Sequence, residues 1–193
     1  MHHPEALDPI VAFLREIGIG VEFGDGARNG FLPGLNIQAG VIHVDPDTLV
    51  GSGDLLHEAG HIAILPQRFH ARLGRDLQAD TIAAIEAETG PGTPKDPLLA
   101  TPLLQGESMA QAWSYAATLH LGVPPACVFF PGSHRHADYE GTHPMQRWLE
   151  SGTHQGPSAL AEVGMTGYSG LFAFLGDNGL PPFPQMTRWV QEG

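Results

Sequence analysis

The sequence predicts an α+β fold, because it combines apolar residues at helical spacing with short apolar runs typical of strands. The helical spacing occurs within residues 4–17, 76–89 and 106–120. The strand-like runs, separated by turn residues, are residues 31–32, 35–38 and 41–44. We therefore expect a small mixed or antiparallel sheet packed against a helix that begins near Ser52 and against a second helix at residues 106–120.

The N-terminal elements follow from this patterning. Residues 4–17 predict a helix that Gly18 and Gly20 end. Residues 21–29 contain Asp-Gly and Asn-Gly pairs, which indicate a loop or a hairpin turn. Between the last two predicted strands, Ala39-Gly40 provides a short connection.

The central helix has its own start and stop signals. Ser52 is a candidate N-cap, Asp54 falls in the predicted first turn, and Pro66 follows the apolar run. Residues 90–102 are rich in Gly and Pro, which predicts a long loop before the small-residue helix at 106–120.

The chain has 193 residues, a length that predicts one domain. We expect its core within about residues 1–125 and a loop-rich C-terminal subdomain at about 126–193, because glycine and proline concentrate there. Within that subdomain, residues 144–150 and 158–163 predict short helices, and residues 172–175 predict a core segment.

Composition excludes several classes of protein. A formal net charge of −12 disfavours binding to nucleic acid or to an anionic membrane, since both need a basic surface. No apolar run is long enough to span a bilayer, and the N-terminus lacks the pattern of a signal peptide. Cys127 is the one cysteine, which excludes an intramolecular disulfide and a cysteine-based zinc site. A cytoplasmic protein fits these features; its oligomeric state is left open.

The segment His57-Glu58-Ala59-Gly60-His61 carries the strongest chemical signal. On a helix, residues four apart lie on one face, so His57 and His61 direct two imidazoles at one point. Neutral imidazoles suit Zn²⁺, and Glu58 beside them suits a general base for metal-activated water. With 11 His and 11 Glu in the chain, chance gives about 0.035 occurrences of this pattern. The alternative is a core helix that happens to carry two histidines.

A catalytic zinc usually has three protein ligands, so the third must come from elsewhere in the chain. The extended three-histidine pattern is absent, because His70 stands at the wrong offset. Glu107 is the preferred third ligand, since it begins a small-residue helix suited to close packing. Gln111, one turn further on, is placed to hydrogen-bond that ligand. Asp80 is the alternative ligand, and an ordinary acidic residue in a first helical turn is the other interpretation of Glu107.

His57-Glu58-Ala59-Gly60-His61, followed by a glutamate on a later helix, resembles the zincin metallopeptidases of the gluzincin type. The short preceding sheet and the small size are similar to small uncharacterised bacterial members. The resemblance covers about residues 35–120. It implies a zincin-like fold, a Zn²⁺ cofactor, hydrolysis of a peptide or protein substrate, His57, His61 and Glu107 as ligands, and Glu58 as the base.

Other roles stay open at the level of sequence. The donor that stabilises a developing oxyanion is not singled out among five candidates: Tyr115, His120, Tyr139, His143 and Tyr168. His134-Arg135-His136 is either a secondary metal or anion site or an exposed polar loop. A zincin-shaped zinc-binding domain without activity, regulatory or peptide-binding, is the alternative function. Hydrolysis of a non-peptide amide is a third and less favoured hypothesis for the function.

Overall fold

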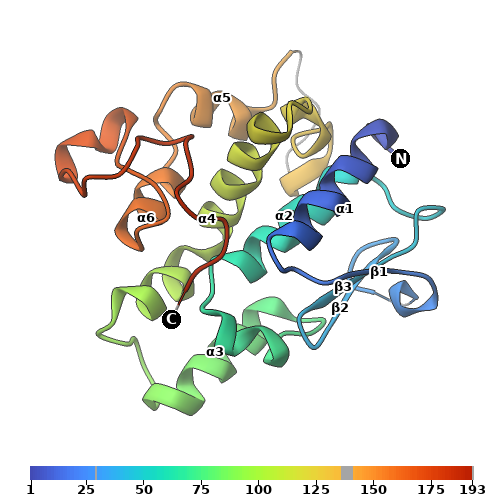
Figure 1. Cartoon of the computed structure of the whole chain (residues 1–193), viewed down its shortest axis with the longest axis horizontal. Helices are drawn as coiled ribbons and strands as arrows, with labels where there is room; N and C mark the ends of the chain where they lie inside the picture. The colour runs from blue at the N-terminus through green and yellow to red at the C-terminus, as the bar shows by residue number, and fades with distance from the viewer. Residues whose placement is uncertain (29, 136–140, 193) are drawn as a thin grey trace.

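A computed structural model describes residues 1–28, 30–135 and 141–192 of the chain. It has the predicted α+β class, with one three-stranded mixed sheet and a larger set of helices (Figure 1). The sheet order is β1-β3-β2. Strand β1 (Val21–Phe23) runs parallel to β3 (Val41–Val44), and β2 (Leu35–Gln38) pairs with β3 antiparallel.

The α-helices are α1 (Leu7–Glu16), α2 (Ser52–Ala63), α3 (Leu77–Thr89), α4 (Pro97–Leu121), α5 (Pro144–Glu150) and α6 (Gly156–Glu162). Short 3-10 turns are η1 (Pro4–Ala6), η2 (Asp25–Ala27), η3 (Gln67–Arg72), η4 (Pro125–Cys127), η5 (Ser133–Arg135) and η6 (Gly170–Leu175). In Figure 1, α4 passes through the middle of the molecule, with α2 and the sheet on one side and α5 and α6 on the other.

The β2–β3 hairpin forms where the pattern predicted it. Ala39 and Gly40 both have positive φ, 50° and 75°, as a two-residue turn between antiparallel strands requires. The segment before β1 and β2 was less well predicted. Residues 21–23, expected in a loop or hairpin, form β1, while residues 31–32 contribute only an isolated bridge from Leu32 to Leu35. Strand β1 is short and pairs with β3 across a crossover, which local patterning does not show.

Helix α2 begins one residue earlier than its expected cap implies. Gly51 is the N-cap, and its backbone N–H donates to the Asp54 carboxylate at 3.1 Å. Ser52 is already helical, and its hydroxyl donates instead to the His3 carbonyl at 2.8 Å. The N-terminal segment therefore anchors the start of the helix that carries the motif.

The prediction of a loop over residues 90–102 was wrong in its second half, because α4 begins at Pro97. Asp96 caps α4 by accepting from the Leu98 N–H at 3.0 Å, and Pro97 occupies the first turn, where its missing N–H costs nothing. The helix continues through Pro102 and has a non-helical residue at Gln105 (φ −128°, ψ 18°). A proline inside a helix removes a backbone donor and favours such an irregularity.

Helices α2 and α4 pack antiparallel at close range. A Cβ on Gly60 would lie 3.0 Å from the Ala110 carbonyl oxygen, and the nearest atom to one on Gly106 would belong to Ile64. The small residues of both helices thus let their backbones approach. This packing brings the middle of α2 beside Glu107.

The C-terminal third contributes to the same core. Leu160 of α6 and Met165 are fully buried with residues of α2 and α4. The Trp113 indole N–H donates to the Trp189 carbonyl at 2.9 Å, so the final segment lies against α4. The short helices expected near 144–150 and 158–163 are α5 and α6. Residues 172–175 were wrongly expected in the core: Phe174 and Leu175 are exposed in η6.

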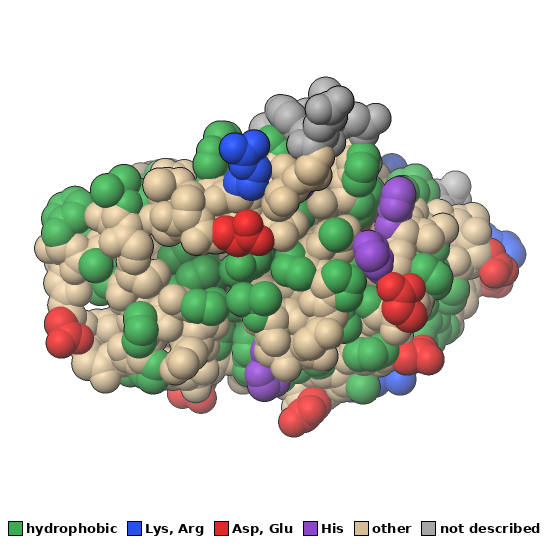
Figure 2. Space-filling view, turned by 90° about the horizontal axis from the view of Figure 1, so that it is seen from above, with side chains coloured by type: hydrophobic (Ala, Val, Ile, Leu, Met, Phe, Trp, Pro, Cys, Tyr) green, Lys and Arg blue, Asp and Glu red, His purple; other side chains and the backbone are tan. Residues whose placement is uncertain are grey.

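The surface is poor in basic side chains. The chain contains nine Lys and Arg residues and 21 Asp and Glu residues. On the face shown in Figure 2, hydrophobic side chains lie between polar ones, and the blue Lys and Arg side chains are few. Within the part of the chain that the structure describes, none of the helices combines the length and apolarity needed to cross a membrane.

Candidate metal centre

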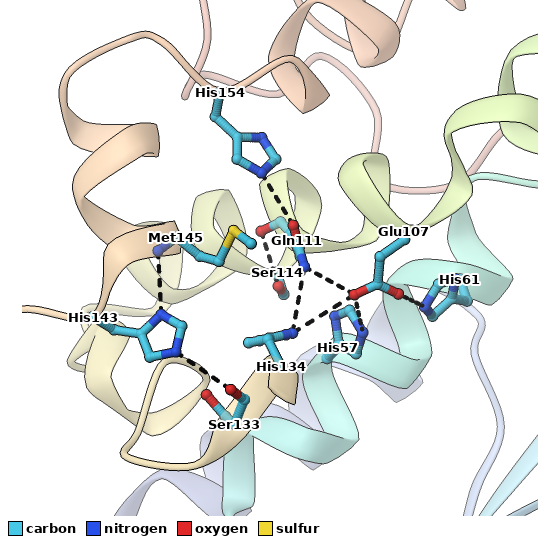
Figure 3. Close-up of polar contacts among 10 residues, drawn as sticks. All are labelled: His57, His61, Glu107, Gln111, Ser114, Ser133, His134, His143, Met145 and His154. Atoms are coloured by element: carbon cyan, nitrogen blue, oxygen red, sulfur yellow. Dashed lines mark hydrogen bonds and ion pairs between the residues drawn. The ribbon is translucent and has the colours of Figure 1, made fainter. Parts of the chain in front are cut away.

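Helix α2 directs the side chains of His57, Glu58 and His61 toward the side on which α4 lies. His57 and His61 are one turn apart, and their ring centroids lie 4.9 Å from each other at 80°. Glu58 is on the edge of the same face and is 7% exposed. Figure 3 shows both imidazoles directed at the carboxylate of Glu107 on α4.

Glu107 bridges the two motif histidines. Its Oε1 lies 3.6 Å from His57 Nε2, and its Oε2 lies 3.2 Å from His61 Nε2. The carboxylate is partly removed from water, which alone would raise its pKa. The imidazoles of His134, His57 and His61 outweigh this and hold the pKa of Glu107 far below its usual range. The structure thus brings together the three residues that the sequence analysis grouped as ligands.

Two buried polar side chains behind Glu107 hold it in place. The Gln111 amide donates to Glu107 Oε1 at 2.8 Å, as the spacing predicted. Its carbonyl oxygen accepts from His154 Nε2 at 3.0 Å, while His154 Nδ1 accepts from the Gly156 N–H at 3.0 Å. His154 is therefore neutral with its proton on Nε2, and burial lowers its pKa to about 4.

His134 is a third imidazole beside Glu107, and the sequence analysis did not choose it as a ligand. It comes from η5 with φ 50° and ψ 29°, a left-handed conformation that is costly outside glycine. Its Nδ1 lies 3.7 Å from Glu107 Oε1, and its ring centroid lies 4.7 Å from that of His57. His134 is thus no exposed loop residue. The one signal for it was the cluster His134-Arg135-His136, of which His136 lies outside the described residues.

Burial dominates the electrostatics of the motif. Loss of water lowers the pKa of His57 to about 4, which keeps this imidazole neutral. Burial also opposes a charge on His61, yet its contact with Glu107 and the charge of Glu58 raise its pKa overall. For Glu58, burial raises the pKa to about 7. A carboxyl with a pKa near neutrality is suited to gain and lose a proton.

The donor set is chemically suited to a zinc ion. Ligand atoms of His57, Glu107 and His134 all lie within 4.8 Å of one another, and His61 contacts the same carboxylate. Imidazole nitrogens and a carboxylate oxygen are typical zinc ligands. Gln111 and His154 supply the outer support that orients a ligand. His57 lacks such support, since its buried Nδ1 has no partner among the described residues.

Two cavities meet at this centre. The first, about 770 Å³, extends along the C-terminal end of α2; we name it the C-terminal cavity. The second, about 740 Å³, extends along the N-terminal end of α2 and is named the N-terminal cavity. Glu58, Gln78 and Glu107 line both. A molecule that enters either cavity therefore reaches Glu58.

The alternative ligand and the candidate oxyanion donors are placed elsewhere. Asp80 accepts a hydrogen bond from the Gly74 N–H at 2.8 Å and lines neither cavity. Of the five candidates, Tyr139 lies outside the described residues. The other four line neither cavity: Tyr115, His120, His143 and Tyr168.

Their surroundings explain this placement. Tyr115 stacks with Phe183, and His120 packs against Phe13. His143 Nδ1 accepts from the Met145 N–H at 3.2 Å as the cap of α5, and the dashed contacts of its ring in Figure 3 go to Met145 and Ser133, not to Glu107. Among the histidines in this region, His134 rather than His143 faces the carboxylate.

Comparisons of the chain with known proteins did not assign it to a family. A scan against protein-family models found no match, and neither the search of curated proteins nor that of solved structures found one.

Proposed function

We propose that this protein is a zinc-dependent hydrolase of zincin type that cleaves peptide bonds. One observation carries the proposal. The Glu58 side chain is 7% exposed and lies where two cavities meet, beside the clustered residues His57, His61 and Glu107. A carboxylate held largely away from bulk water is costly for the fold, and a zinc site with a purely structural role has no need of one.

Each residue has a defined part in this proposal. His57, His61 and Glu107 hold the ion, and Gln111 keeps the Glu107 carboxylate turned toward the histidines. Zinc, when bound, supplies a Lewis acid that polarises a carbonyl and makes water more acidic. Because burial keeps His57 neutral, its Nε2 lone pair is free for an ion at neutral pH.

Glu58 carries the proton chemistry. Its pKa of about 7 lets the carboxylate take a proton from the attacking water and deliver it to the leaving amine. The water oxygen forms the new bond to the carbonyl carbon, and the carbon–nitrogen bond breaks. The products are a carboxylate and an amine, and Glu58 returns to its starting state.

The test combines metal analysis with a peptide-library digest. Purified protein, loaded with zinc, is expected to bind one ion per chain and to cleave a subset of peptides. Glu58→Gln keeps the shape of the side chain and removes its basicity, so we expect full metal content with activity lowered about 10³-fold or more. A Glu58→Gln protein as active as wild type contradicts the assignment of the base.

A second candidate function rests on His134. If its imidazole is a fourth ligand, the ion has no open position, and the protein is a zinc-binding regulatory or peptide-binding domain without activity. The convergence of His134 Nδ1 on Glu107 at 3.7 Å favours this alternative. The buried Glu58 carboxyl, whose pKa is raised to about 7, favours hydrolysis.

A further inference from the structure

The residues of α2 that line the two cavities form one continuous stripe. Their spacing follows the three- and four-residue steps of a helix face. On α2 they are Asp54, His57, Glu58 and His61, and the stripe continues through Ile64 and Leu65, which follow the helix end at Ala63. From Asp54 to the C-cap Ile64 the stripe is about 15 Å long at 1.5 Å per residue. An extended peptide of about five residues spans the same distance at about 3.3 Å per residue.

The position of Glu58 divides this length. Asp54 and His57 belong to the N-terminal cavity, whereas His61, Ile64 and Leu65 belong to the C-terminal cavity. A bond that reacts beside Glu58 therefore has room for substituents on both sides. The two cavities have similar volumes, about 770 and 740 Å³. A small amide would fill only one of them.

The walls of the C-terminal cavity select for apolar groups. Half of its lining residues are hydrophobic, beside the charged Arg75 and Asp76. The hydrophobic residues come from four separate segments of the chain and include Phe31, Ile64, Leu65, Leu77, Ile82 and Leu103. Ile82 is 37% exposed, so it presents an apolar surface that water otherwise covers. Burying an apolar side chain there is favourable because it removes apolar surface from water.

The walls of the N-terminal cavity are mixed. Val50, Phe130 and Met145 are apolar, and Asp54 and Ser133 are polar. Its described lining contains no Lys or Arg, so a terminal carboxylate entering it meets no cation. The Asp54 carboxylate already accepts from the Gly51 N–H, at 3.1 Å. The N-terminal cavity is therefore not suited to anchor a free carboxylate end of a peptide.

We propose that the two cavities are one groove that binds an extended peptide of about five residues, with an apolar side chain in the C-terminal cavity. The bond cleaved is internal to the peptide. This inference rests on the proposed function for its cleavage step, and water is the only co-reactant.

Peptides with both ends blocked test the groove. The probes are ten-residue peptides, N-acetylated and C-amidated, with Leu, Asp or Lys at each position in turn. Zinc-loaded wild-type protein is expected to cleave them internally, with Leu preferred at one fixed position beside the cleaved bond. Cleavage restricted to peptides with a free end would overturn the proposal.

Charge variants assign each cavity to one side of the bond. Ile82→Asp in the C-terminal cavity is expected to lower kcat/KM for the Leu peptide about tenfold or more, with partial rescue by Lys at that position. Val50→Asp, at a residue 41% exposed in the N-terminal cavity, should change preference on the opposite side of the bond. Leu171→Asp, at a residue 62% exposed in η6 and outside both cavities, is the control and should stay within twofold.

Binding separates failure of the groove from failure of the proposed function. Fluorescence polarisation of the labelled blocked peptides on zinc-loaded Glu58→Gln protein reports the groove without cleavage. Binding that Ile82→Asp weakens, with no cleavage by wild type, keeps the groove and rejects the hydrolase. Cleavage whose preferences ignore both Ile82→Asp and Val50→Asp keeps the hydrolase and rejects the groove.

Discussion

Glu107 and Gln111 lie one turn apart on α4, and the Gln111 amide donates to Glu107 Oε1 at 2.8 Å while the other carboxylate oxygen faces His61. This contact holds the Glu107 carboxylate where it faces both motif histidines. The helix thus positions the acidic residue, and the amide decides where its carboxylate points.

Removing Glu107 should remove the metal. We expect Glu107→Ala to lower zinc affinity at least 100-fold, because two histidines alone make a weak site, while Asp80→Ala binds zinc as wild type does. Competition with a chromophoric chelator measures both affinities. If Glu107→Ala retains wild-type affinity, the ligand assignment is wrong.

The Gln111 contact has a matched control elsewhere in the chain. Gln146 donates to Glu150 at 2.8 Å with the same four-residue spacing, but on exposed α5. Gln111→Leu should lower zinc affinity about 10- to 100-fold, because Glu107 loses its orientation and the His154 N–H loses its acceptor. Gln146→Leu should leave affinity unchanged. Equal effects of the two variants would mean that Gln111 does not orient the ligand.

His134 distinguishes an open from a closed metal centre. In the proposed hydrolase, His134→Ala keeps zinc bound with an affinity within tenfold of wild type, since three ligands remain. His134, which is then no ligand but lines the N-terminal cavity, is placed to donate to the developing oxyanion, so its loss should lower activity about 100-fold. Absorption of the cobalt-substituted protein reports the coordination. A loss of affinity as large as that of Glu107→Ala favours the closed site without activity.

Acid should destabilise the metal-free protein through its buried histidines. His154 and His57 have pKa values lowered from 6.5 to about 4 by burial. A group whose folded pKa is depressed contributes stability above its unfolded pKa and loses it as pH falls through the folded value. We therefore expect these two histidines to lower the free energy of unfolding between about pH 6.5 and pH 4, while Glu58, whose pKa burial raises to about 7, acts in the opposite direction.

The His154→Gln variant isolates one part of this acid sensitivity. It removes one titrating group, so the fall over that window should be smaller by about 2 kcal/mol. Urea unfolding at a series of pH values measures the difference. Parallel pH profiles of wild type and His154→Gln would show that His154 is not the group responsible.

Close packing of α2 on α4 depends on Gly60. A Cβ there would lie 3.0 Å from the Ala110 carbonyl oxygen, so Gly60→Leu must separate the helices and should cost about 3 kcal/mol. At Gly106, the nearest atom to an added Cβ is 3.9 Å away, and Gly106→Ala should stabilise the helix by about 0.5–1 kcal/mol. Thermal unfolding compares the two; a neutral Gly60→Leu would contradict this account of the helix contact.

Local pattern was sufficient for the elements with a strong periodic signal. The spacing of His57 and His61 needs only helical geometry, and the turn at Ala39-Gly40 needs only two adjacent residues. Strand β1 was missed because it is three residues long and gains its partner across a crossover. The start of α4 was missed because Pro97 breaks a helix in the interior but begins one well in the first turn.

The sequence by itself determined the fold class and the face that carries His57, Glu58 and His61, since both follow from residue periodicity; it favoured Glu107 as their partner but left Asp80 open. Only the tertiary structure decided that His134 and His154 join the centre and that Asp80 and His143 do not. Those four residues are distant in the chain from the motif, and the packing of α4, η5 and the segment before α6 sets their distances to Glu107. Such distances depend on long-range packing, which no local pattern encodes.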